Sequence, residues 1–172
     1  MSPGEIHDEH PFATPPEMRD PVRQFRGRLA SPVTLVTSGE PAARAGLTVS
    51  SLLVADGDPS FVHLLVGNST DLWDAIRETG SFIVHVLTAE HRELSDRFAS
   101  IRPSPGGLFL GIAVGDTDYG PEIGAIGTRA YCRYVGHFDD AYHALVHGII
   151  ERVVLDDVRR PLQYYRGEYF HG

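Results

Sequence analysis

The chain has 172 residues, 42% of them hydrophobic, and this length and composition fit one globular domain. Its 23 acidic residues outnumber its 15 basic ones, and a net charge of -8 repels nucleic acid phosphates and anionic lipid headgroups. All of these basic residues are arginines, which excludes Schiff-base chemistry and a Walker-type phosphate lysine. We therefore expect neither nucleic acid nor a membrane surface as a partner.

The cysteine content and the hydropathy pattern indicate a cytoplasmic location. Cys132 is the single cysteine and cannot form an internal disulfide, and the first residues lack the basic and apolar regions of a secretory signal. The longest apolar stretches, 51–55 and 61–66, are far shorter than the roughly 20 residues that a membrane-spanning helix needs. We expect no membrane span.

The first part of the chain predicts a tail followed by a helix. Residues 1–18 contain several acids and prolines without apolar periodicity, and they predict a flexible N-terminal tail in front of a domain over 19–172. Residues 19–29 then predict a short amphipathic helix, because their apolar residues recur every three or four positions after the capping pair Asp20-Pro21.

The rest of the chain predicts strands with only occasional helices. β-Branched and apolar runs bounded by turn residues predict strands over 33–37, 45–55, 61–66, 82–87, 127–135 and 143–154. Helices are expected over 71–77, ended by Gly80, and from Thr88 to Ser100. Residues 102–120 have no clean period and predict a functional loop or flap. Short turns between strands favour a mainly β, antiparallel barrel over a parallel doubly wound sheet.

The order of these features resembles the flavin reductase-like family, which has the FMN-binding split-barrel fold. The matching segments are 32–37, 45–52, 58–62, 68–70, 74–76, 80–87, 96–99, 161–162 and 165–169. The resemblance implies a Greek-key antiparallel split barrel with a few short flanking helices, and a homodimer with one flavin per subunit near the interface. It also implies FMN or FAD as cofactor, NADH or NADPH as reductant, hydride transfer between them, and a monooxygenase component as a potential partner.

The segment of Thr48, Val49, Ser50 and Ser51 is the first candidate flavin site. A flavin needs donors for its phosphate and polar groups along the edge of its ring, and alternate residues of a strand can present hydroxyls on one face. The resemblance implies that this segment fixes the ring edge. The alternative is that its hydroxyls belong to an ordinary half-exposed strand.

Asn68, Ser69 and Thr70 form the second candidate site, for the flavin phosphate. They stand just before the helix predicted at 71–77, where free N–H groups and the helix dipole favour an anion. An ordinary helix cap provided by Ser69 or Thr70 explains the same residues. The family often has an arginine near position 68 and a threonine near position 72, and this chain has Asn68 and Leu72 there.

The resemblance places Phe98, Ala99 and His143 on the nicotinamide side of the flavin. Phe98 and Ala99 end the helix that lies close to the ring in the family, although Phe98 also fits the core-facing side of an amphipathic helix. His143 matches the histidine of a Gly-Asp-His turn that helps to bind nicotinamide, but Ala141 and Tyr142 precede it here. A surface or structural histidine is the alternative.

We expect no metal site. His143 and His147 share one face of the predicted strand, but two histidines without a third ligand at a suitable spacing are a weak metal signal.

Three other functions remain open on the sequence. The first is a flavin-binding or storage module without nicotinamide oxidation. The second is a flavoprotein oxidoreductase that keeps its FMN and acts on its own small substrate, with a deazaflavin as one option. The third is a cofactor-free interaction domain. Tight flavin retention would favour the second, and absence of flavin binding the third.

Overall fold

The structure is a computed structural model that describes residues 20–170, so the predicted tail over 1–18 lies outside the described residues. The prediction of a mainly β chain with a few short helices is confirmed. In chain order the elements are α1 Pro21–Gly27, β1 Ser31–Pro32, β2 Thr34–Ser38, β3 Ala45–Val49, β4 Leu52–Ala55, β5 Phe61–Gly67, α2 Asp71–Thr79, β6 Ser81–Val86, the 3-10 turn η2 Ala89–His91, α3 Arg92–Phe98, β7 Val114–Thr117, β8 Gly120–Ile123, β9 Arg129–Asp140, β10 His143–Val154, β11 Gln163–Tyr165 and β12 Glu168–Phe170.

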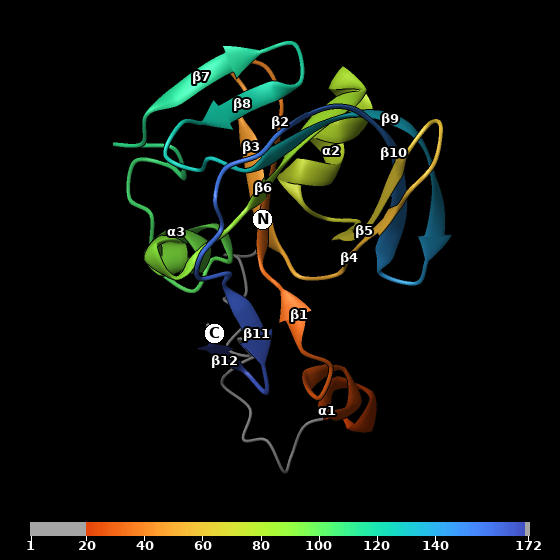
Figure 1. Cartoon of the computed structure of the whole chain (residues 1–172), viewed down its shortest axis with the longest axis vertical. Helices are drawn as coiled ribbons and strands as arrows, with labels where there is room; N and C mark the ends of the chain where they lie inside the picture. The colour runs from red at the N-terminus through yellow and green to blue at the C-terminus, as the bar shows by residue number, and fades with distance from the viewer. Residues whose placement is uncertain (1–19, 171–172) are drawn as a thin grey trace, which may run out of the picture.

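Seven strands form the main sheet in the order β3-β2-β6-β9-β10-β5-β4, with antiparallel pairing throughout. β3 and β4 are its two ends, and the sheet is not closed. β1, β11 and β12 form a small second sheet, and β7 pairs with β8. Figure 1 shows the small sheet and α1 at one end of the molecule and the β7–β8 hairpin at the other.

The strand predicted over 45–55 is wrong, because this segment forms two strands at opposite ends of the sheet. β3 ends at Val49, which is buried, and β4 begins at Leu52. The apolar pattern runs through both strands, so it does not reveal that β3 pairs with β2 whereas β4 pairs with β5. Ser50 and Ser51 are the connection, where the chain leaves one end of the sheet and enters the other.

The segment 102–120 is also more regular than predicted, because it contains β7 and the start of the β7–β8 hairpin. The hairpin packs on β2, where the Thr37 hydroxyl donates to the Pro121 carbonyl at 2.6 Å. Gly120 has a φ of 118°, and a Cβ at this position would lie 2.9 Å from the Ser38 Cα. Glycine at position 120 therefore permits the close approach of the hairpin to β2.

The last two long strands extend further than predicted. β9 runs to Asp140, beyond the predicted end at residue 135, and only Ala141 and Tyr142 separate it from β10. The turn was expected at 139–141 but begins at Ala141, which has a φ of 51° in the left-handed region.

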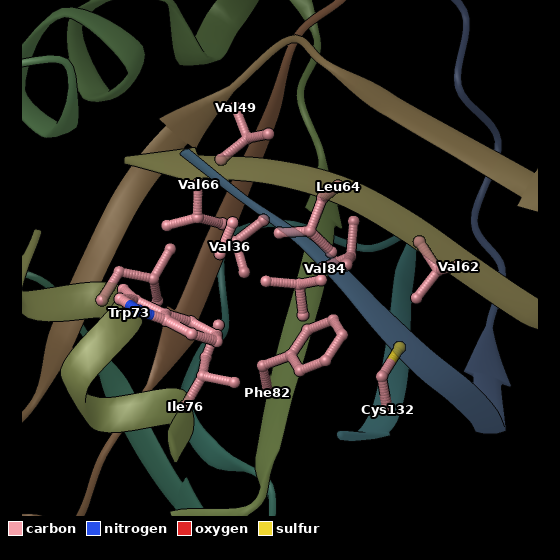
Figure 2. Packing of buried hydrophobic residues seen from close by; sticks show 13 residues of the cluster. Val36, Val49, Val62, Leu64, Val66, Trp73, Ile76, Phe82, Val84 and Cys132 are labelled. Carbon is pink, nitrogen blue, oxygen red and sulfur yellow. The ribbon is translucent and has the colours of Figure 1, made fainter. Parts of the chain in front are cut away.

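The core lies on both faces of β2, all five residues of which are buried. Val36 belongs to a first cluster with residues of α2, β5 and β6, whereas Leu35 belongs to a second cluster with Phe98 and Ile123. Figure 2 shows the first cluster, in which Trp73 and Ile76 lie on α2 and Phe82 and Val84 on β6. A strand buried on both faces reads as a continuous apolar run.

The signals at the start of α1 and the end of α2 are confirmed, whereas the helix predicted from Thr88 to Ser100 is shorter, because Ala89–His91 form a 3-10 turn and α3 runs over Arg92–Phe98. Asp20 caps α1 by accepting from the Val22 amide at 2.8 Å, and Pro21 occupies the first turn. Gly80 ends α2 with a φ of 71°, as predicted. Within residues 20–170, no helix has the length and apolar character needed to span a membrane.

His85 on β6 is fully buried and joins three parts of the fold. Its Nδ1 lies 3.0 Å from the Leu35 carbonyl on β2, and its Nε2 lies 3.2 Å from the Ile123 amide on β8. Because an amide can only donate, Nε2 accepts and Nδ1–H donates, which is the pattern of a neutral ring. Burial lowers the pKa of His85 to about 4, although the bond to Leu35 opposes this shift.

His85 should make the protein less stable as the pH falls. Its pKa rises from about 4 in the folded state to 6.5 in the unfolded state, so its contribution is complete above pH 6.5 and is lost between pH 6.5 and 4. The loss should be about 3 kcal/mol in the free energy of unfolding. His85→Gln keeps one donor and one acceptor but does not titrate, so urea unfolding of this variant should show a flatter pH dependence than that of the wild type. Parallel pH curves for the two proteins would contradict this role.

Candidate functional site

In the segment from Thr48 to Ser51, the first two side chains hold the fold together and the two serines remain accessible. The Thr48 hydroxyl donates to the Ser95 carbonyl at 2.7 Å and so fastens β3 to α3. Val49 is buried in the first cluster, which leaves only its backbone for a ligand. Ser50 and Ser51 are half-buried, and the Ser51 carbonyl accepts from the Leu65 amide at 3.1 Å. These two serines are the hydroxyls that remain accessible.

The segment from Asn68 to Thr70 joins the end of β5 to α2. Thr70 is the cap of α2, because its hydroxyl accepts from the Trp73 amide at 3.3 Å. The Asn68 side chain donates to the Ala141 carbonyl at 3.3 Å, which holds this segment against the β9–β10 turn. Ser69 is exposed. Thr70 therefore has the ordinary capping role that the sequence left open.

His143 is exposed at the start of β10 and lies beside this same segment. It pairs with Gly67 on β5 and with Asp140 on β9. The Asn68 amide donates to the Tyr142 carbonyl at 3.0 Å, one residue before His143. The structure therefore brings the second candidate segment and His143 together at the adjacent ends of β5 and β10.

Phe98 is in the core rather than on a ligand surface. Its side chain is 1% exposed, and its ring meets that of Phe109 edge to face with centroids 5.1 Å apart. A Cβ on Gly46 would lie 2.6 Å from the Phe98 ring, so β3 passes directly over it. Ala99 ends α3 with its amide bonded to the Ser95 carbonyl at 2.9 Å. Of this pair, only Ala99 is accessible in part.

The predicted residues therefore form two groups. Thr48, Phe98 and Ala99 lie where β3 meets α3, and Asn68 to Thr70 lie with His143 where β5 meets β10. Val49 packs in the same cluster as Val66 and Leu72, so the serines that follow it stand between the two groups.

A pocket of ≈ 560 Å³, which the sequence does not predict, lies between η2 with α3 and residues 102–110. Arg97 and Ser104 line it. Arg97 Nη2 donates to the Gly107 and Leu110 carbonyls, each at 2.8 Å, and fixes this segment to the helix. Within residues 20–170, Arg97 Nε and Ser104 Oγ are buried without a hydrogen-bond partner. The only sequence signal was a Pro/Gly-rich stretch without a period.

The matching segment 165–169 near the C-terminus also contacts α3. The Tyr169 hydroxyl lies 2.9 Å from that of Ser95, and the Arg92 guanidinium lies 5.4 Å from the centre of the Tyr169 ring. Burial is the largest cause that raises the pKa of Tyr169, so this phenol is neutral at physiological pH. These contacts of Tyr169 hold α3, which Ala99 caps, in position.

The titratable groups give no support for nucleophilic catalysis by the cysteine. Cys132 is buried in the first cluster, and burial raises the pKa of its thiol to about 12. A thiol with this pKa is not a thiolate at neutral pH. Within the described part of the chain, no group of three or more His, Cys, Asp or Glu side chains could hold a metal ion, and His147 instead meets His63 edge to face at 4.6 Å.

The burial of Phe98 leads to a test that separates packing from cofactor contact. Phe98→Ala should lower the free energy of unfolding by about 3 to 5 kcal/mol, because it leaves a cavity in the second cluster. Phe98→Leu should cost less, since Leu fills more of the volume. Urea unfolding measures both effects, and a fluorescence titration with flavin should give the same Kd for Phe98→Leu as for the wild type. A large rise in Kd would instead place the ring in contact with the ligand.

Comparison with known proteins identifies the family. The model of the flavin reductase like domain matches residues 26–172. The reductase subunit HsaB of a flavin-dependent monooxygenase from Mycobacterium tuberculosis is 31% identical over 153 residues, which cover 86% of this chain and 79% of that protein. The NADH-dependent FMN reductase AsuE2 of Streptomyces nodosus subsp. asukaensis is 30% identical over 155 residues, with 88% and 83% covered. The solved structure of nitrilotriacetate monooxygenase component B from Mycobacterium thermoresistibile has a TM-score of 0.78 at 28% identity and covers 87% of this chain and 84% of that one. The predicted resemblance is thus confirmed, and the chain belongs to the flavin reductase like domain family.

Proposed function

We propose that this chain is a flavin reductase that transfers a hydride from NADH, or NADPH, to FMN or FAD. The observation that carries the proposal is the connection at Ser50 and Ser51, where the chain passes between the two ends of the open sheet. It presents two half-buried serines beside β5, where the Ser51 carbonyl accepts from the Leu65 amide, and Asn68 follows the same strand. Membership of the family and the activity named for AsuE2 support the same function.

The serine connection fits the ring of a flavin better than the start of α2 fits its phosphate. Ser50 and Ser51 offer hydroxyl and backbone groups of the kind that the polar edge of the ring needs. Thr48 contributes indirectly, because its hydroxyl is engaged with Ser95 and positions α3. At the start of α2, by contrast, the Thr70 hydroxyl is engaged as a cap and acidic side chains occupy the first turn.

The contribution of the protein is mainly to position the two ligands. When bound, the nicotinamide supplies a hydride and the flavin accepts it together with a proton, so the products are oxidised nicotinamide and reduced flavin. His143 lies exposed beside Asn68 and can donate or accept a hydrogen bond at the nicotinamide carboxamide. Ser50 and Ser51 would hold the other ligand at the distance that transfer requires.

We also propose that the reduced flavin passes to a partner monooxygenase and that the protein acts in the cytoplasm. The relative HsaB is named as the reductase subunit of a flavin-dependent monooxygenase, and component B is named for a nitrilotriacetate monooxygenase. The acidic chain with a single buried cysteine agrees with a cytoplasmic location.

A homodimer is part of this proposal, because one outer face of the sheet carries exposed apolar side chains beside two histidines. Leu53 pairs with His63 and His63 with His147, whereas Leu65 pairs with Leu145. Directly paired residues share a face, and this face is opposite to the buried residues of β5. Phe138 on β9 extends it, since it pairs with Leu145 and is 72% exposed. Exposed apolar patches of this kind mark protein interaction sites.

The resemblance implies a Greek-key split barrel, and the observed sheet has β3 and β4 at its two ends. Figure 1 shows β4, β5 and β10 on one side of the molecule, away from α3. We propose that the apolar face of these strands lies at the subunit interface, next to the serine connection.

The proposed reduction is tested by following NADH and NADPH oxidation at 340 nm with and without flavin. Flavin-dependent oxidation is expected. His143→Ala should raise the KM for the nicotinamide by about two- to tenfold, which is the effect of one lost hydrogen bond, and leave the Kd for flavin unchanged. His91→Gln removes an imidazole from η2 but keeps hydrogen-bonding groups there, and it is the control, with no change in KM. Flavin binding without oxidation would instead support a storage module or an oxidoreductase with its own substrate.

The proposed interface is tested by the oligomeric state. Leu53→Asp should shift the protein from dimer to monomer in sedimentation velocity, because it places a charge in an apolar contact. Leu155→Asp is the control, since Leu155 follows β10 and is 78% exposed, close to the 72% of Leu53. A wild-type monomer at micromolar concentration, or equal dissociation of both variants, would contradict the assignment.

A further inference from the structure

The amino end of α2 is the place where the sequence predicted the flavin phosphate. The Thr70 hydroxyl there accepts from the Trp73 amide at 3.3 Å and donates to the Gly67 carbonyl at 2.8 Å. The hydroxyl thus already has one donor and one acceptor within the protein. A phosphate would have to displace it or bind without it.

Two carboxylates add a charge that opposes a phosphate at this place. Asp71 and Asp74 both lie in the first turn of α2, and both are exposed. Asp74 forms an ion pair with Arg77, whereas Asp71 has no ion pair within residues 20–170. Acidic residues in a first turn complement the positive end of the helix dipole. A bound phosphate would therefore meet the negative charge of these carboxylates, which already complement the helix dipole.

No cation of the neighbouring sequence offsets the Asp71 carboxylate. The segment 48–76 contains no arginine, and the whole chain contains no lysine. Arg44, which precedes β3, makes a bidentate contact with Asp116, with distances of 2.8 and 2.7 Å from Nη2. Arg77 lies near the other end of α2, over the Trp73 ring at 5.2 Å. Arg44 is therefore engaged with Asp116 and Arg77 with Asp74, and neither pairs with Asp71.

We propose that Asp71 is a specificity-determining residue that makes this chain recognise the ring and ribityl chain of a flavin and not its 5′-phosphate. The proposal rests on the flavin reductase function proposed above and names its preferred substrate class as phosphate-free flavin, with riboflavin as the simplest member. The Asp71 carboxylate can accept hydrogen bonds from ribityl hydroxyls. A phosphomonoester instead brings a charge of about -1.5 to -2 toward it.

The test measures flavin binding by fluorescence titration and, separately, NADH oxidation, each with riboflavin, FMN and FAD. In the wild type the Kd for riboflavin should be equal to or lower than that for FMN. Asp71→Asn should lower the Kd for FMN by about two- to fivefold and should not lower that for riboflavin. Asp56→Asn removes one exposed carboxylate from the β4–β5 turn and is the matched control, with both Kd values unchanged.

Salt provides a second readout, because screening weakens the repulsion between two exposed charges. Added NaCl should lower the Kd of the wild type for FMN and leave that for riboflavin unchanged, and the difference should be smaller in Asp71→Asn. A Kd for FMN about tenfold below that for riboflavin, or equal responses of Asp71→Asn and Asp56→Asn, would overturn the proposal. Riboflavin binding without NADH oxidation would overturn the proposed function and leave the role of Asp71 supported, so the two failures can be told apart.

Discussion

The burial of β2 on both faces is the constraint on which the rest of the structure depends. A strand with Val36 in one cluster and Leu35 in another needs a cover on each side. α2 and β5 supply the first cover, and α3 with the β7–β8 hairpin supplies the second. The buried polar groups of the strand follow the same plan, because Thr37 binds the hairpin and the Leu35 carbonyl binds His85. The two layers thus share one strand, and neither can move independently of it.

This arrangement decides where a ligand can bind. Where core packing fixes a side chain, as at Val49 and Phe98, the residue contributes only to the scaffold. The accessible polar groups lie where the chain leaves that packing, at Ser50 and Ser51 after β3 and at Asn68 after β5. Rigid strands on either side hold these short connections in place, as is common for binding sites on loops. The candidate site is therefore a consequence of where the core strands end.

The sequence predicted what depends on local pattern and missed what depends on partners. The double burial of β2 made its apolar run visible, and Gly80 marked the end of α2 because a left-handed residue is needed there. The division at Ser50 was invisible, since the apolar pattern does not state which strand pairs with which. The β7–β8 hairpin was missed for the opposite reason, because Gly120 serves a close contact with β2 and weakens the strand pattern. For the site, Ser50, Ser51 and His143 stay predictions of the family resemblance, and the structure adds that Phe98 is buried in the core.

The distribution of arginine explains why recognition at this site would depend on shape and hydrogen bonds rather than on positive charge. Arg133 pairs with Glu151 at 2.7 Å and lowers the pKa of that carboxyl, and Arg152 lies 3.5 Å from the centre of the Tyr131 ring. These contacts lie on β9 and β10, which pair with each other and with β6 and β5, respectively, and not with β3. In a chain with a net charge of -8, cations engaged in such contacts are not available to a phosphate between β3 and α2. If a flavin binds as proposed, it would meet serine hydroxyls, backbone groups and the Asp71 carboxylate, and this set would favour a neutral, hydroxyl-rich molecule with an aromatic ring.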